Sequence, residues 1–278
     1  MIIDFHTHVG KIVNSSVEDL LRSMDKAKID RSVIISGDDV VGLNRLELMD
    51  ILNMYPHRFY GVIGVSPEKI KTEKKINMLF ELLKHNQVLG YKFYVGYEHY
   101  YPNDIKNFTA CYETHDVNYY GNNIYNQHPN GSQEILFDKL EKTNKFAMFH
   151  TGDTYCACKK AKLKFAHPLN IDDLATDRPN LKIIMAHLGY PWHRDAAEVM
   201  YKNKNVYADV SGFVYGDFTP KDKENFKLMM EEYLRINDNC DRLLLGTDFP
   251  ISNQLSYIDT LKELGLFEKL NKNNSIII

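Results

Sequence analysis

The chain has 278 residues, of which 44% are hydrophobic and 26% charged, and its 34 basic and 37 acidic side chains leave a net charge of −3. This composition is ordinary for a globular protein and excludes collagen-like, disordered and coiled-coil classes. The balanced charge argues against a nucleic-acid partner, and the apolar runs are far shorter than the ~20 residues of a membrane-spanning helix. Without a basic and apolar leader, we expect a cytoplasmic protein. Homo-oligomerisation stays open.

Eight short apolar runs recur along the chain and predict strands. They cover residues 2–3, 32–35, 59–65, 88–95, 146–149, 181–185, 206–210 and 243–245. Most of them are continuous rather than alternating in polarity. This pattern is typical of parallel strands that are covered on both faces of the sheet.

Helical patterns separate these runs. A capping box at residues 15–18 predicts the start of a first helix, which continues to Ala27. Further helices are expected at residues 44–54, 76–83, 133–143, 194–201, 221–234 and 255–264. Strands that alternate with helices eight times predict a single-domain (β/α)8 TIM barrel over residues 1–278. The alternative, a doubly wound sheet with an extra lobe, lacks a G-x-G-x-x-G after any strand.

One connection, residues 96–131, is much longer than the others and is rich in Tyr, Asn and His. Loops of this length are usually functional or disordered. The aromatic residues favour an ordered insertion after the fourth strand. We expect either a lid over the site or a surface excursion that contacts another subunit.

Metal-competent side chains follow the predicted strands, at the end of a barrel where active groups lie. The first strand runs into Asp4-Phe5-His6-Thr7-His8. His6 and His8 share one face of the strand and could hold one cation. Asp4 lies one step deeper on that face and could accept a hydrogen bond behind the ligands.

The ends of strands 5, 6 and 8 show the same pattern, with His150, His187 and Asp248. A single such residue is usually a hydrogen-bonded surface group or a helix N-cap. Four strand ends in order favour a metal site at the barrel mouth instead. Imidazole and carboxylate ligands suit zinc, manganese, iron or cobalt, and the lack of a Cys ligand argues against a purely structural zinc. Lys92, inside the fourth strand, is costly to bury unless it is paired.

The motifs D-x-H-x-H, FHTGD, AHLG-x-PW and GTDFP together resemble the amidohydrolase superfamily over about residues 2–253. The chain is similar to the branch that includes carboxymuconate-semialdehyde decarboxylase, hydroxybenzoate decarboxylases and lactonases. The resemblance implies a divalent metal, zinc first with manganese or iron as alternatives, on His6, His8, His150 and Asp248. His187 would be an acid–base residue or a ligand of a second metal. Lys92 would be a carboxylated lysine between two metals, a cation for a substrate carboxylate, or the partner of an acidic residue in the site, so one or two ions are expected.

The resemblance implies hydrolysis of an amide, ester or lactone bond in a small carboxylated substrate. Asp248 would accept the proton of a metal-activated water, and protonated His187 would polarise the substrate oxygen. The alternative on the same site is non-oxidative decarboxylation, with His187 or Asp248 as the acid. Tyr94, Trp192 and Arg194 are the predicted substrate-binding residues, and simple packing is the alternative for the two aromatic ones.

Two other classes fit less well. A phosphoesterase of the polymerase-and-histidinol-phosphatase type also opens with D-x-H-x-H, but its metal set ends in D-x-H, whereas Phe249-Pro250 follows Asp248. A catalytically silent barrel would have no reason to keep every ligand. The chain departs from the family at the 96–131 insertion. It also departs in its last residues, 275–278, where an apolar tail predicts a shortened or degenerate last helix.

Overall fold

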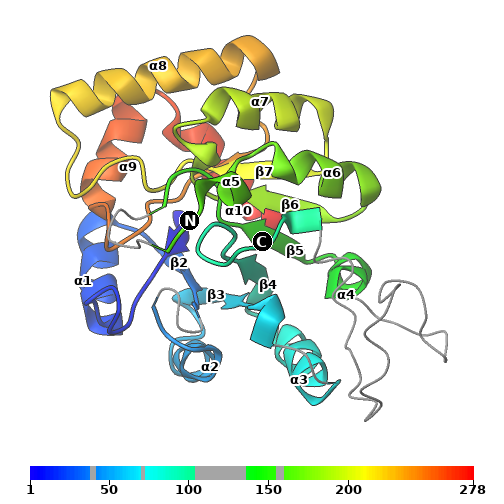
Figure 1. Cartoon of the computed structure of the whole chain (residues 1–278). Coiled ribbons are helices and arrows are strands. Elements are labelled where there is room, and N and C mark those ends of the chain that lie inside the picture. The colour runs from blue at the N-terminus through cyan, green and yellow to red at the C-terminus, as the bar shows by residue number, and fades with distance from the viewer. Residues whose placement is uncertain (38–41, 70–72, 104–135, 155–159) are drawn as a thin grey trace.

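The computed structural model describes residues 1–37, 42–69, 73–103, 136–154 and 160–278. Eight parallel strands pair in chain order and form a nearly closed TIM barrel, as predicted (Figure 1). All eight predicted strands are confirmed. Their bounds are β1 (Ile3–Thr7), β2 (Arg31–Ile35), β3 (Phe59–Gly64), β4 (Val88–Phe93), β5 (Phe146–Phe149), β6 (Lys182–Met185), β7 (Val206–Asp209) and β8 (Leu243–Leu244).

Helices surround the strands on the outside of the barrel (Figure 1). The helices that the sequence predicts are α1 (Val17–Ala27), α2 (Arg45–Met54), α3 (Glu73–Leu83), α4 (Leu136–Thr143), α7 (His193–Lys202), α8 (Pro220–Asn237) and α9 (Gln254–Glu263). The capping box of α1 lies one residue later than predicted. Ser16, not Ser15, is the N-cap, and its partner three residues on is Asp19.

Three further helices were not predicted: α5 (Leu163–Ala166), α6 (Asn170–Asp177) and α10 (Phe267–Ile277). The last of these corrects the expectation of a degenerate C-terminal helix. Ile277, near the end of α10, packs with Phe5, Val33 and Leu244 in the cluster that fills the barrel interior. The apolar tail is therefore part of the core.

The barrel closes between β8 and β1 through single backbone hydrogen bonds. Phe5 N donates to Leu245 O at 2.8 Å, and His8 N donates to Phe249 O at 2.7 Å. Asn274 of α10 is fully buried behind this junction. Its Nδ2 donates to Ile3 O and Leu245 O, both at 2.8 Å, and its Oδ1 accepts from Leu245 N at 3.0 Å. One side chain therefore joins the first and last strands.

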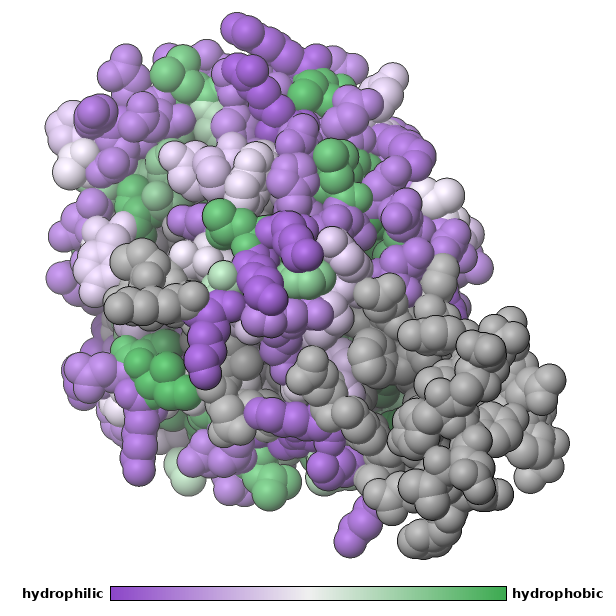
Figure 2. Space-filling view, in the orientation of Figure 1, coloured by the Kyte–Doolittle hydropathy of each residue, from purple (hydrophilic) through white to green (hydrophobic). Residues whose placement is uncertain are grey.

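The surface seen in Figure 2 is mostly polar, with apolar side chains in small, dispersed patches. None of the helices in the described part of the chain is long and apolar enough to cross a membrane. The predicted insertion at residues 96–131 falls mainly on residues 104–135, which lie outside the described ranges. The same is true of the first three residues of the helix predicted at 133–143.

Candidate metal centre

The predicted metal-competent residues meet at the carboxyl ends of the strands. His6 is in β1 and His8 follows it, while His187 lies in the short 3-10 helix η3 (Ala186–Gly189) directly after β6. Asp248 follows β8, and its backbone N donates to His6 O at 2.8 Å. The junction that closes the barrel thus places Asp248 against the two histidines of β1.

Three of these side chains converge on one point. His6 Nε2 and His8 Nε2 are 3.2 Å apart. Asp248 Oδ1 lies 3.6 Å from His6 Nε2 and 3.4 Å from His8 Nε2. Ligand atoms bonded at ~2.0–2.2 Å to one tetrahedral cation lie about 3.3–3.6 Å apart. The spacing of the three atoms fits a shared divalent ion, and the same residues form one of two metal-competent groups among the described residues.

The protonation of the two imidazoles supports this fit. His6 Nδ1 lies 2.9 Å from the Asp209 carboxylate, and His8 Nδ1 lies 3.1 Å from Ile35 O. A carboxylate and a carbonyl only accept hydrogen bonds, so each neutral ring carries its proton on Nδ1. Burial lowers the pKa of His6 to about 4 and that of His8 to about 3, which keeps both rings neutral. Neither Nε2 then has a proton, and two buried lone pairs face each other beside a carboxylate.

Burial and neighbouring charges shift the pKa of Asp248. Burial raises the pKa of its carboxyl well above the usual value, and the negative charges of Asp209 and Asp4 raise it further, while Lys92 opposes them. Without a cation, the carboxyl therefore tends to hold a proton. A divalent ion would satisfy the two nitrogen lone pairs and the carboxylate together.

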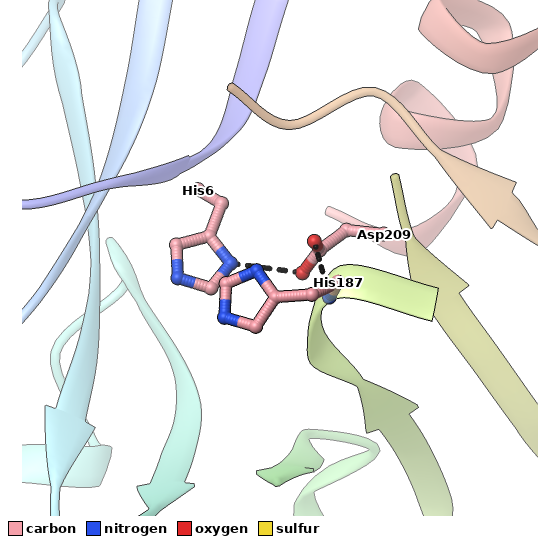
Figure 3. A group of neighbouring side chains, drawn as sticks. All are labelled: His6, His187 and Asp209. Atoms are coloured by element: carbon pink, nitrogen blue, oxygen red, sulfur yellow. Dashed lines mark hydrogen bonds and ion pairs between the residues drawn. The ribbon is translucent and has the colours of Figure 1, made fainter. Parts of the chain in front are cut away.

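Asp209, the last residue of β7, is a site residue that the sequence prediction missed. It is fully buried, and its two oxygens contact His6 and the backbone N of His187, the latter at 3.0 Å (Figure 3). Burial alone would raise its pKa, but the interaction with His6 holds the pKa well below the ordinary value. Asp209 is thus an ionised carboxylate behind the predicted ligands.

Asp4 has a different role from the one predicted for it. Its carboxylate accepts from Thr247 N at 2.9 Å, from Thr247 Oγ1 at 2.6 Å and from Gln254 Nε2 at 2.7 Å. It also accepts from the backbone N of His6 at 3.2 Å, but no hydrogen bond joins it to an imidazole in the described structure. Asp4 therefore fixes the chain just before Asp248, and the carboxylate that contacts a ligand ring is Asp209.

His150 and His187 complete a group of four neighbouring imidazoles. The His187 ring lies 4.8 Å from the His6 ring and 5.2 Å from the His150 ring, centroid to centroid. His150 Nε2 donates to Asp153 O at 2.8 Å, which leaves Nδ1 as its unprotonated nitrogen. His150 belongs to neither metal-competent group. It lies beside the centre, so it would fit its predicted role as a ligand if a second ion were bound.

The chain between these residues approaches very closely at Gly212, which follows β7. Its φ of +69° is in the left-handed region, and a Cβ there would lie 2.9 Å from His187 Nδ1 and 3.0 Å from Asp248 Oδ2. Only glycine fits both the conformation and the space. The loop after β7 can therefore pack against both functional side chains.

Lys92 points into the barrel with its ammonium group buried. Its side chain is 1% exposed, and Nζ has no hydrogen-bond partner within the described ranges. Nζ lies 5.6 Å from the centre of the Tyr94 ring. Burial lowers the pKa of Lys92 to about 8, although Asp209 and Asp248 oppose that shift. The site thus contains a buried cation that is available to an anionic group.

This burial predicts a pH-dependent stability. Lys92 has an ordinary pKa of 10.5, so between about pH 8 and 10.5 the unfolded chain binds more protons than the folded one. Stability contributed at this position therefore rises with pH across that window, by about 3 kcal/mol at most. We expect the unfolding free energy of the metal-free protein, relative to Lys92→Met, to increase accordingly in urea titrations at pH 7 to 10. A constant difference between the two proteins would contradict this.

The three predicted substrate-binding residues all have protein partners. Tyr94 is buried, and its hydroxyl donates to Ser36 O at 2.8 Å. The Trp192 ring lies 5.0 Å from the ring of His167. The Arg194 side chain is 70% exposed and forms an ion pair with Glu232 of α8. Of the three, only Tyr94 is shown next to a residue of the centre, Lys92.

An eight-stranded barrel whose mouth gathers imidazoles, a carboxylate and a buried lysine is typical of barrel enzymes, whose active groups lie at this end, and its side chains could hold a metal ion. The family is identified by sequence: the family model for amidohydrolases matches residues 3–273. The chain therefore belongs to the amidohydrolase family, and the protein is an enzyme of that superfamily. No curated protein sequence matches it.

Solved structures agree on the fold at low sequence identity. An amidohydrolase from Burkholderia multivorans with bound zinc is 11% identical, with a TM-score of 0.63 over 99% of this chain and 95% of that one. A putative 2-pyrone-4,6-dicarboxylic acid hydrolase from Pseudomonas putida is 15% identical, with a TM-score of 0.62 over 98% of this chain and 93% of that one. A 5-carboxyvanillate decarboxylase from Novosphingobium aromaticivorans with bound manganese is 11% identical, with a TM-score of 0.61 over 98% of this chain and 94% of that one.

Proposed function

We propose that the protein is a metal-dependent hydrolase that cleaves an amide, ester or lactone bond in a small carboxylated molecule. The convergence of the unprotonated Nε2 atoms of His6 and His8 with Asp248 carries the proposal, because one divalent cation would satisfy all three groups at once. His6, His8 and Asp248 would hold this cation. We propose zinc, with manganese or iron as alternatives, since imidazole and carboxylate ligands suit all three. His150 and His187 would take part if a second ion binds.

When bound, a divalent cation supplies Lewis-acid chemistry, since it lowers the pKa of water and polarises a substrate oxygen. The protein's own groups would do the rest. Asp248 Oδ1 faces His6 and His8, so Oδ2 is the oxygen left to accept a proton. Burial, and then the proximity of His6, lowers the pKa of His187 to about 3. His187 would therefore start as a neutral proton acceptor, and the imidazolium predicted from the sequence would form only during turnover.

We propose that Lys92 recognises a carboxylate of the substrate. Its buried Nζ without a hydrogen-bond partner supports this role, because an unpaired buried ammonium gains from an incoming anion. Tyr94 would pack against the same part of the substrate. The substrate contacts of Trp192 and Arg194 stay predictions, as do the cytoplasmic location, the small-molecule partner and any homo-oligomer.

Non-oxidative decarboxylation is the second candidate. The similar fold of the manganese-bound 5-carboxyvanillate decarboxylase supports it, and in such a reaction His187 or Asp248 would deliver a proton to the carbon that loses CO2. A screen of lactones, N-acyl compounds and aromatic acids distinguishes the two. We expect release of a new carboxylic acid from a lactone, ester or amide. Release of CO2 from an aromatic acid, with no hydrolysis, would establish the decarboxylase instead.

Metal content tests the centre without a substrate. We expect the purified protein to contain about one equivalent of zinc, manganese or iron, measured by elemental analysis. Adding the metal back to stripped protein should raise its thermal midpoint, because the ion binds only the folded state. Stripped protein that responds to none of these ions would refute the centre. In Lys92→Met the metal content should stay unchanged, whereas a fall would show that Lys92 is a metal-bridging carboxylated lysine.

A further inference from the structure

A single buried carboxylate lies behind two of the imidazoles. We propose that Asp209, acting through Ser211 on one side, is a positioning residue that places the ring proton of both His6 and His187 on Nδ1. Each ring would then present an unprotonated Nε2 to the mouth of the barrel. This inference rests on the proposed metal-dependent function, which it extends to a residue outside the sequence motifs.

The contact with His6 is direct. Asp209 Oδ2 lies 2.9 Å from His6 Nδ1, and both side chains are fully buried. Figure 3 shows the carboxylate behind the His6 ring, on the side that carries Nδ1. Because the carboxylate can only accept, the ring proton must be on Nδ1. Carboxylates placed in this way behind a metal-binding histidine fix its tautomer and orientation.

The contact with His187 runs through a hydroxyl group. His187 Nδ1 lies 2.9 Å from Ser211 Oγ and 3.3 Å from Ser211 O. Ser211 Oγ donates its own proton to Asp209 Oδ1 in a short hydrogen bond. The hydroxyl can therefore only accept from His187, as the Ser211 carbonyl also does. Both acceptors require the His187 proton on Nδ1.

The same network explains why the residue is Asp and not Asn. Asp209 Oδ1 accepts three hydrogen bonds: from His187 N at 3.0 Å, from Ser211 N at 3.1 Å and from Ser211 Oγ. An amide NH2 group cannot occupy a position surrounded by three donors. In Asp209→Asn the amide oxygen would stay there, and the NH2 group would face His6 Nδ1. The amide would then donate to His6 Nδ1, which favours the His6 proton on Nε2 over Nδ1, where Ser211 Oγ at 3.2 Å would be the remaining acceptor.

Asp4 provides a matched control. It is also a fully buried aspartate at the carboxyl end of the barrel, and it accepts hydrogen bonds from Thr247 and Gln254. It makes no hydrogen bond to an imidazole ring in the described part of the protein. Asp4→Asn therefore perturbs a comparable buried network without touching the Nδ1 atom of any metal-competent histidine.

The test is the 15N spectrum of the histidine side chains in metal-free protein, with long-range couplings to locate each ring proton. In the wild type we expect His6 and His187 as Nδ1–H tautomers. In Asp209→Asn we expect His6 to become Nε2–H while His187 stays Nδ1–H. Zinc affinity, from chelator competition, should fall about 10- to 100-fold in that variant. Asp4→Asn should leave both tautomers unchanged.

An Nε2–H tautomer at His6 or His187 in the wild type would overturn the inference, even if Asp209→Asn did not fold. An unchanged His6 tautomer in folded Asp209→Asn would do the same. Both readings are made without metal, so they stand apart from the proposed function. If the wild type shows the expected tautomers but binds no zinc, manganese or iron, the proposed function fails while the positioning role of Asp209 holds.

Discussion

Replacing Asp248 with Asn is expected to reduce turnover about 10³-fold while the fold is retained. The amide has nearly the same size and keeps an oxygen toward His6 Nε2 and His8 Nε2, but it cannot accept a proton. It also removes one negative charge from the centre, so metal affinity should fall. The measurement is kcat at saturating metal on the substrate found by the screen, with the bound metal quantified in the same sample.

Asp153→Asn is the matched control for this variant. Asp153 is also an aspartate that follows a strand, but it contacts His150 through its backbone carbonyl and not through its side chain. We expect its turnover to stay within a few-fold of the wild type. Near-normal turnover in metal-loaded Asp248→Asn would remove Asp248 from the mechanism and leave it, at most, as a ligand.

Replacing Asn274 with Ala is expected to lower the free energy of unfolding by about 3 kcal/mol or more. The substitution removes three hydrogen bonds and takes from Leu245 N its Asn274 acceptor, while Leu245 O keeps the bond from Phe5 N; a buried backbone group that loses its partner costs roughly 1–3 kcal/mol. Urea unfolding of metal-free protein should show a lower midpoint. The slope should stay the same, because the surface exposed on unfolding does not change.

Asn271→Ala separates this effect from a general loss of asparagine in α10. Asn271 is half-buried, and it accepts from Ile3 N at 3.1 Å and donates to Met1 O at 3.1 Å, at the start of the chain. Its loss should cost about 1 kcal/mol, since water can replace partners at that edge. Equal destabilisation by the two variants would show that Asn274 has no special place in closing the barrel.

The site residues found from sequence are those that interrupt an apolar run at its end. His6, His8 and Asp248 stand out in this way, and the structure brings them together. Asp209 lies inside the apolar run at residues 206–210, whose pattern predicts only a strand. Like Lys92, it is a charged residue inside a buried strand, so the cost of burying a charge marks both of them as candidate site residues. Which carboxylate contacts which ring depends on pairing across the barrel, which local sequence does not contain.

The fold was predictable where periodicity is strong and not where single contacts decide it. All eight strands and seven helices follow from apolar patterns. Helix α6 is short, which weakens its apolar pattern. In α10 the buried residues include Asn273 and Asn274, so polar side chains occupy positions that a helical periodicity predicts to be apolar. Their amides donate to backbone carbonyls in and beside β1 and β8, a role that hydrophobic patterning cannot reveal.

The closure between β8 and β1 has a thermodynamic consequence. His6 and His8 come from the first strand, and Asp248 comes from the chain that leaves the last one, so an ion held by all three would bridge this junction in addition to its backbone hydrogen bonds. Metal binding would then connect the first and last strands of the barrel. Amide protons of Phe5, His8 and Asp248 should exchange with solvent more slowly in the loaded protein, which couples cofactor retention to the integrity of the whole cylinder.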